Sequence, residues 1–255
     1  MLYHFLYPLK DSYSFFNVFK YITFRAVLAA TTAFLISIIC GPWLIRKLTQ
    51  FKIGQQLRSA DECLDLYKLH RGKAGTPTMG GILIVLSIVF SVLLWADLQN
   101  HYILLTLLAT LWFAAVGFID DYIKLAKKRS KGLSILEKFI PQAFMGLLIG
   151  YYAYMNKSLG SQLDVPFLKD IIFDFGVWYI FFAMTVVVGC SNAVNLTDGL
   201  DGLAIGCTIM VALTYSILTY ISGHAVFSKY LFIPFIPGAG ELSIFCASIL
   251  GEIRL

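Results

Sequence analysis

The chain has 255 residues and a formal net charge of +5; 58% of its residues are apolar or aromatic and 14% are charged. Soluble domains carry about 25% charged residues, and their apolar residues form amphipathic stripes rather than long blocks. The long apolar blocks of this chain exclude an ordinary soluble protein and indicate an integral membrane protein, whose positive charge anionic lipid headgroups explain without a nucleic-acid partner.

The N-terminal stretch 1–16 lacks the basic, apolar and small-residue regions of a cleaved signal. Its Tyr and Phe residues predict a segment at the level of the lipid headgroups. The five cysteines of the chain have no paired spacing, which excludes a disulfide framework or a zinc motif.

Long apolar segments predict the membrane-spanning helices, each of which needs about 20 predominantly apolar residues. Six candidates lie near 26–45, 79–96, 102–119, 139–155, 175–194 and 203–221. A seventh apolar segment begins near 242 and reaches only to near 250. The predicted fold is therefore all-α: one transmembrane domain over residues 1–255, with six full spans and a partial seventh.

Basic residues are distributed unevenly among the predicted loops. The loops 46–78 and 120–138 hold seven and six Lys or Arg residues, whereas 97–101, 156–174 and 222–240 hold none, two and one. Basic loops are retained in the cytoplasm. The sequence therefore predicts a periplasmic N-terminus, with the loops after the first, third and fifth spans in the cytoplasm.

Two adjacent carboxylates, Asp120 and Asp121, close the third predicted span in the segment FIDDYIK. Ionisable groups at the end of a spanning helix are costly unless they are paired or used. Neighbouring helical residues point about 100° apart, so we expect no simple acid pair, whereas Asp120 and Lys124 have the spacing of a helix ion pair. The alternatives are a polar cap at the water interface and a Mg²⁺ site, because Mg²⁺ binds carboxylates together with substrate phosphates.

Polar side chains fall at every third position between the fifth and sixth predicted spans, in the segment NAVNLTDGLDGLA. They are Asn192, Asn195, Asp198 and Asp201. Steps of three drift by about 60° each in an unbroken helix, so Gly199 and Gly202 predict a break that lets the last three converge. A structural turn explains one Asp-Gly pair but not four spaced polar groups at membrane depth, which favours a binding site.

The segment KAGTPTMGG, with Lys73, Thr76 and Thr78, leads into the second predicted span. Small residues allow close backbone approach, and the start of a helix offers unpaired N–H groups to an anion. Lys73 supplies a point charge suited to phosphate. Alone, such a run is typical of a turn, but it shares the predicted cytoplasmic face with both acidic segments. Together the three predict a pyrophosphate substrate and phosphoryl transfer, with a carboxylate as general base.

These three segments, in this order and on this face, resemble the phospho-N-acetylmuramoyl-pentapeptide transferases, a branch of the polyprenyl-phosphate sugar-phosphate transferases. The resemblance covers essentially the whole chain. It implies transfer of phospho-MurNAc-pentapeptide from UDP-MurNAc-pentapeptide to undecaprenyl phosphate, which forms lipid I and UMP in peptidoglycan synthesis. It also implies Mg²⁺, a multi-pass position in the lipid bilayer of the bacterial inner membrane and a cytoplasmic active site; a homodimer is left open.

Carried over by position, the resemblance makes Asp120, Asp121 and Asp198 the expected catalytic and metal-binding residues. The expected substrate-binding residues are Lys73, Thr76, Thr78, Lys124, Asn192, Asn195 and Asp201. In the family, further spans with a third catalytic aspartate and a histidine-rich loop follow the segment at 241–245. The chain has no counterpart of them, which predicts a C-terminally truncated transferase.

Three alternatives accompany this interpretation. A catalytically incomplete fragment of the enzyme would keep the motifs without the activity. A related polyprenyl-phosphate sugar-phosphate transferase would share the acidic segments but not the GTPTMGG run. A membrane transporter would place its carboxylates near the bilayer midplane, whereas these lie at the ends of predicted spans.

Overall fold

The computed structural model describes residues 2–50, 80–126, 132–156, 158–164, 172–197 and 202–252. Its helices are α1 (Leu2–Leu6), η1 (Tyr7–Asp11), η2 (Ser14–Lys20), α2 (Ile22–Gln50), α4 (Gly81–Trp95), α5 (His101–Ala126), α6 (Ile135–Met155), α7 (Trp178–Thr197), α8 (Leu203–Ser222), α9 (Ala225–Tyr230), η4 (Ala239–Glu241) and α10 (Leu242–Leu250). Two short strands, β1 (Gln162–Asp164) and β2 (Ile172–Asp174), pair antiparallel. All seven apolar segments are therefore helical as predicted, while the small hairpin departs from the all-α prediction.

Four helices of the described chain, α2, α5, α7 and α8, are long and apolar enough to cross a membrane. The apolar helix α4 has 15 residues, so it is about 22 Å long against a hydrocarbon core of about 30 Å. Within the described residues α7 buries none of its side chains and α8 buries only Ala212. Apolar helices with exposed side chains require lipid around them. The fold is that of a helical membrane protein.

The buried core lies where α2, α4, α5 and α10 meet. Ala29, Val92, Ile103 and Ile244, one from each of these helices, are fully buried in one apolar cluster. The end of α10 approaches α2 so closely that a Cβ on Gly251 would collide with the Ala30 carbonyl. The short C-terminal helix is thus packed inside the bundle.

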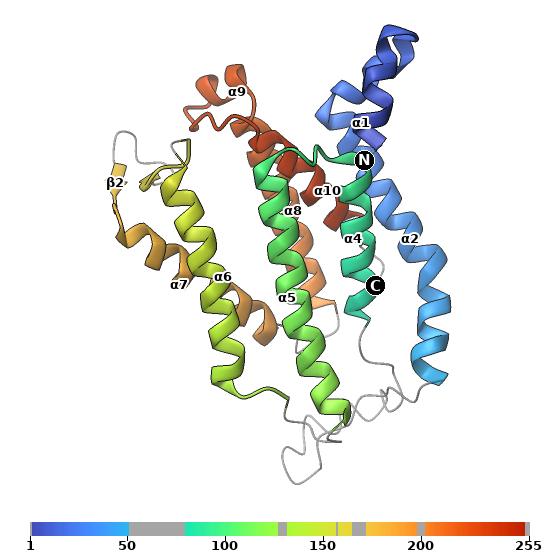
Figure 1. The fold of residues 1–255 in the computed structure, drawn as a ribbon, viewed down its shortest axis with the longest axis vertical. Coiled ribbons are helices and arrows are strands. Elements are labelled where there is room, and N and C mark those ends of the chain that lie inside the picture. Colours follow the sequence, from blue (N-terminus) through green and yellow to red (C-terminus); the bar gives the residue numbers. More distant parts are fainter. Residues whose placement is uncertain are drawn as a thin grey trace.

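Helices α6 and α7 form an antiparallel pair at one side of the bundle (Figure 1). A Cβ at Gly146 would lie 2.9 Å from Met184 Cα, and one at Gly150 would lie 2.7 Å from the Ile180 carbonyl oxygen. Small residues four apart let two membrane helices approach closely. The pair is tied to α5 by Trp112, whose indole N–H donates to the Pro141 carbonyl over 2.9 Å.

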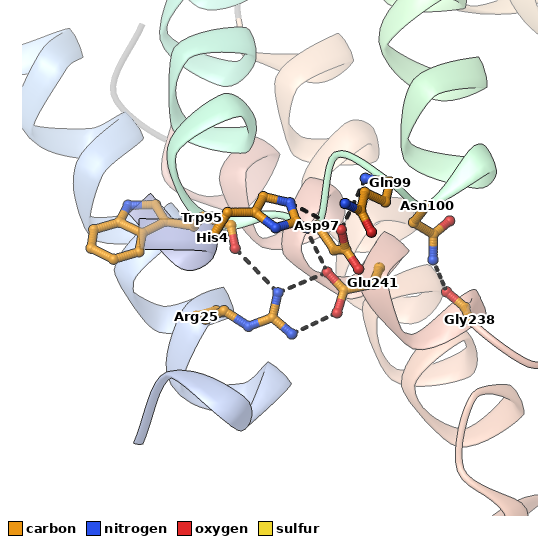
Figure 2. A network of polar contacts seen from close by, with 8 residues as sticks. All are labelled: His4, Arg25, Trp95, Asp97, Gln99, Asn100, Gly238 and Glu241. Atoms are coloured by element: carbon orange, nitrogen blue, oxygen red, sulfur yellow. Dashed lines mark hydrogen bonds and ion pairs between the residues drawn. The ribbon is translucent and has the colours of Figure 1, made fainter. Parts of the chain in front are cut away.

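A buried ion pair joins α2 to η4 at one end of the bundle (Figure 2). Both Arg25 terminal nitrogens donate to Glu241, over 2.8 and 2.5 Å, and Arg25 also donates to the Trp95 carbonyl over 3.2 Å. The backbone N–H of Asp97 donates to the same carboxylate over 3.0 Å. A buried charge is tolerated when it is paired and hydrogen-bonded, so this network fixes the turn between α4 and α5.

The opposite end of the bundle collects the helix ends that carry the polar sequence motifs. The last turns of α2, α5 and α7 and the first turns of α4, α6 and α8 point to this end, which is lower in Figure 1. We call it the site face. The directions of these helices alternate along the chain.

Candidate active site

Asp120 lies near the end of α5, which continues past the predicted span to Ala126, and its carboxylate is engaged on all sides. Lys124 Nζ lies 2.7 Å from Oδ2, and Lys138 Nζ, on α6, lies 3.0 Å from Oδ1. The backbone N–H of Leu133 also donates to Oδ1, over 2.7 Å. Asp120 is only 8% exposed. A buried carboxylate needs such partners, so Asp120 and its two lysines fasten α5 to the start of α6.

The start of α6 is shaped to reach this carboxylate. The Ser134 side chain accepts from the Glu137 backbone N–H, while the Glu137 carboxylate accepts from the Ser134 backbone N–H, a complete capping box. Two residues before the cap, a Cβ on Gly132 would collide with Asp120 Oδ1. The glycine therefore lets the backbone come close enough for the Leu133 N–H to bind Asp120.

Asp121 has different surroundings. Its Oδ1 lies 3.0 Å from Lys124 Nζ, and 40% of its side chain is exposed, against 11% for Asp120. The predicted ion pair between Asp120 and Lys124 is confirmed, and Lys124 contacts both carboxylates. Two aspartates balanced by two lysines make a neutral cluster in which Asp121 is the carboxylate open to a ligand.

Asn192 lies near the end of α7 and is held by α6. Its Nδ2 donates to Gln142 Oε1 over 2.9 Å and to the Val188 carbonyl over 2.8 Å. Gln142 Nε2 donates in turn to Ser191 Oγ over 3.1 Å. Asn195 is exposed one turn further along α7. The side chains of Gln142, Ser191 and Asn192 thus meet between α6 and α7 on the site face.

Of the break predicted at Gly199 and Gly202, the structure describes the part at Gly202, and Gly199 lies outside the described residues. Helix α7 ends at Thr197 and α8 begins at Leu203, with Gly202 before it at φ 78°. That left-handed conformation favours glycine. The predicted site residues Lys73, Thr76, Thr78, Asp198 and Asp201 lie outside the described residues. Helix α4 begins at Gly81, the last residue of the KAGTPTMGG segment.

The structure therefore brings Asp120, Asp121 and Lys124 together, and it places Asn192 and Asn195 on the same face. Sequence reasoning missed Lys138 and Gln142, which contact the predicted residues from α6. Gln142 carries a readable signal, because it is a lone amide in an apolar helix and polar groups at membrane depth are costly. Lys138 carries none, because basic residues are common in cytoplasmic loops.

Carboxylate oxygens are ligands that Mg²⁺ prefers, and the exposed Asp121 suits that role. Both oxygens of Asp120 are bound by lysines. In the described part of the chain no three His, Cys, Asp or Glu residues form a cluster able to hold a metal ion. The described residues thus offer one partly exposed carboxylate, that of Asp121, rather than a complete metal site.

Comparison with known proteins agrees with these motifs. The family model described as Glycosyl transferase family 4 matches residues 103–249, which run from the first turn of α5 into α10 and include the site residues on α5, α6 and α7. The first signature of phospho-N-acetylmuramoyl-pentapeptide-transferase matches residues 73–85, at the entry to α4.

Relatives of the same name cover nearly the whole chain. A phospho-N-acetylmuramoyl-pentapeptide-transferase of Desulforapulum autotrophicum is 50% identical over 98% of this chain and 68% of its own length. Those of Syntrophus aciditrophicus and Citrifermentans bemidjiense are each 47% identical over 98% of this chain, and over 68% and 69% of their own lengths. The chain therefore belongs to the phospho-N-acetylmuramoyl-pentapeptide-transferase family.

Proposed function

We propose that this chain, as one transmembrane domain, transfers phospho-MurNAc-pentapeptide from UDP-MurNAc-pentapeptide to undecaprenyl phosphate, forming lipid I and UMP for peptidoglycan synthesis. The observation that carries the proposal is the cluster at the end of α5, where Asp120, Lys124 and Lys138 are paired and Asp121, paired with Lys124 through one oxygen, is the more exposed carboxylate. In phosphoryl transfer the protein mainly positions groups and neutralises charge. A neutral cluster of two acids and two lysines supplies groups of both signs for that task.

The reaction replaces one phosphoanhydride (P–O–P) bond with another. An oxygen of the lipid phosphate becomes bonded to the phosphorus that carries the MurNAc group, and the bond from that phosphorus to the oxygen of UMP breaks. Asp121 is placed to accept a proton or to bind a metal ion, while Lys124 and Lys138 can neutralise phosphate oxygens. Asp121 and Asp198 would hold Mg²⁺, with Asp120 as a further ligand only if it exchanged one of its lysines for the ion, and the bound ion would neutralise charge on the pyrophosphate.

The substrate contacts are assigned from the positions of the residues on the site face. Asn192 and Asn195 lie on the site face and would bind the nucleotide sugar together with Asp201. Lys73, Thr76 and Thr78 precede the start of α4 and would bind phosphate oxygens at the helix N-terminus.

The test of substrate class uses membranes that contain the chain, undecaprenyl phosphate and Mg²⁺. With UDP-MurNAc-pentapeptide we expect a lipid product of the mass of lipid I, and with UDP-N-acetylglucosamine we expect none. The Desulforapulum relative is assayed in parallel to show that the substrates are competent. A product from UDP-N-acetylglucosamine alone would favour a related sugar-phosphate transferase, and no product from either donor would contradict the proposal.

We further propose that the protein crosses the bacterial inner membrane six times, with the site face in the cytoplasm and the N-terminus outside. Ile135, the first residue of α6, and Tyr230, the last residue of α9, are 87% and 78% exposed. The start of α6 and the helix α9 lie at opposite ends of the bundle (Figure 1). In a variant without the five native cysteines, an impermeant maleimide added to spheroplasts should label Tyr230→Cys and spare Ile135→Cys. The reverse pattern would contradict the orientation.

A further inference from the structure

Gln142 is a buried residue whose amide oxygen and amide nitrogen are both hydrogen-bonded. The residue is 8% exposed on α6, and buried polar groups are nearly always hydrogen-bonded. Its Oε1 accepts from Asn192 Nδ2, and its Nε2 donates to Ser191 Oγ. These two bonds fix the orientation of the Gln142 amide, because an exchange of its oxygen and nitrogen would set donor against donor at Asn192.

The same bond fixes the amide of Asn192. Its Nδ2 donates to two carbonyl oxygens, those of Gln142 and Val188, so both of its hydrogens are used. A flipped amide would set Oδ1 against those two acceptors. Among the described residues, none donates to Asn192 Oδ1, and the side chain is exposed. Asn192 therefore presents an acceptor, and not a donor, to whatever binds on the site face.

We propose that Gln142 is a positioning residue for the nucleotide-sugar substrate. It holds the Asn192 amide so that Oδ1 accepts a hydrogen bond from an N–H or hydroxyl group of that substrate. The inference rests on the proposed function for the identity of the substrate. The position of Gln142 supports the inference as well: Gln142 lies on α6 one helical turn after Lys138, which is paired with Asp120.

A purely structural role is the competing explanation, since Gln142 also ties α6 to α7. The two helices also pack closely at Gly146 and Gly150, and this close approach does not depend on the hydrogen bonds of Gln142. A structural tie would make the effect of Gln142 on substrate binding independent of Asn192, whereas positioning would make it depend on Asn192. A double-mutant cycle separates the two.

The first measurement needs no substrate. In detergent-solubilised protein with ¹⁵N-labelled asparagine, the Asn192 side-chain amide is assigned by its loss in Asn192→Ala, and its hydrogen exchange is followed. We expect slow exchange in the wild-type chain and in Gln142→Glu, which keeps the acceptor oxygen. We expect exchange faster by about tenfold in Gln142→Met, because one hydrogen bond is lost.

The second measurement is the affinity for UDP-MurNAc-pentapeptide of the wild type, Gln142→Met, Asn192→Ala and the double variant. We expect Gln142→Met to weaken binding about fivefold in the wild-type background and to have no further effect in the Asn192→Ala background. Gln142→Glu should restore most of the affinity. Trp112→Phe is the matched control, because it removes the bond from α5 to the neighbouring Pro141 and should lower thermal stability without changing the affinity.

The outcomes distinguish the two proposals. Equal effects of Gln142→Met in both backgrounds, or unchanged exchange of the Asn192 amide, would overturn the positioning role while leaving the proposed function intact. A wild-type chain that binds uridine diphosphate but not UDP-MurNAc-pentapeptide would contradict the proposed function, and with it the substrate named here. In that case the cycle is run with uridine diphosphate, and additive effects there would overturn the positioning role as well.

Discussion

Lys138 and Gln142 lie one helical turn apart on α6, and each contacts a residue from a different sequence motif. Lys138 Nζ is 3.0 Å from Asp120 Oδ1 on α5, and Gln142 Oε1 accepts from Asn192 on α7 over 2.9 Å. Four residues advance about 6 Å along a helix. Helix α6 therefore connects the aspartate pair with the amide segment through two neighbouring positions.

Lys138→Met should weaken the attachment of α6 to α5. Asp120 would keep Lys124 and the Leu133 N–H but lose one charged donor, which costs about 1 to 2 kcal/mol of the free energy of unfolding. Thermal unfolding in detergent measures the loss, and release of UMP should fall with it. Lys229→Met, an exposed lysine on α9 at the opposite face, is the control. Equal stability of the two variants would contradict the role of Lys138.

Gly132→Ala should destabilise the protein through a steric collision. The new Cβ would overlap Asp120 Oδ1, so the backbone must move away and the bond from Leu133 lengthens, at a cost of about 1 to 3 kcal/mol. Gly206→Ala is the matched control, because a Cβ there meets nothing within 4 Å inside α8. It should stabilise the helix by up to about 1 kcal/mol. The prediction fails if both substitutions shift the unfolding temperature in the same direction.

Arg25→Met should be among the most damaging single changes. It leaves Glu241 buried without its counter-charge, which costs about 3 to 5 kcal/mol, since the side chains are only 2% and 11% exposed. The double variant Arg25→Met/Glu241→Met removes both charges and should recover much of the loss. Unfolding by SDS titration in micelles compares the variants. A double variant as unstable as the sum of the singles would show that the pair in Figure 2 is not coupled.

The hairpin should depend on pH through Asp174. Hydrogen bonds from the Ser161 hydroxyl and the Gly176 N–H lower the pKa of the Asp174 carboxyl below its ordinary value. Because the folded pKa is depressed, the stabilisation is complete above the ordinary pKa and is lost as the pH falls through the lower, folded value. NMR titration of the carboxyl carbon measures this pKa. Ser161→Ala should raise it, and an unchanged pKa would contradict the stated cause.

The helices were predictable because long apolar segments define them, but their ends depend on polar residues. The span predicted over 102–119 stops where the charges begin, whereas α5 continues to Ala126. Its aspartates pair with Lys124 on the helix surface, which supports a further turn. Helix α6 begins at Ile135 rather than at 139, because Ser134 and Glu137 form a capping box that hydropathy does not register.

The contacts between helices were not predictable from one sequence. Arg25 and Glu241 are separated by 216 positions, and no local pattern connects them. Lys138 and Gln142 likewise meet their partners only through packing of α6 against α5 and α7. The hairpin was missed because strands of three residues are too short for an alternating pattern to be recognised.

Release of UMP from UDP-MurNAc-pentapeptide, measured side by side for the wild-type chain and Asp121→Asn, tests the proposed transferase activity most directly. We expect the wild type to release UMP only when undecaprenyl phosphate and Mg²⁺ are both present. Asp121→Asn, which keeps the size of the side chain but loses its charge, should reduce the rate by about 100-fold or more. Equal rates in the two proteins, or no release by the wild type while the Desulforapulum relative is active, would contradict the assignment.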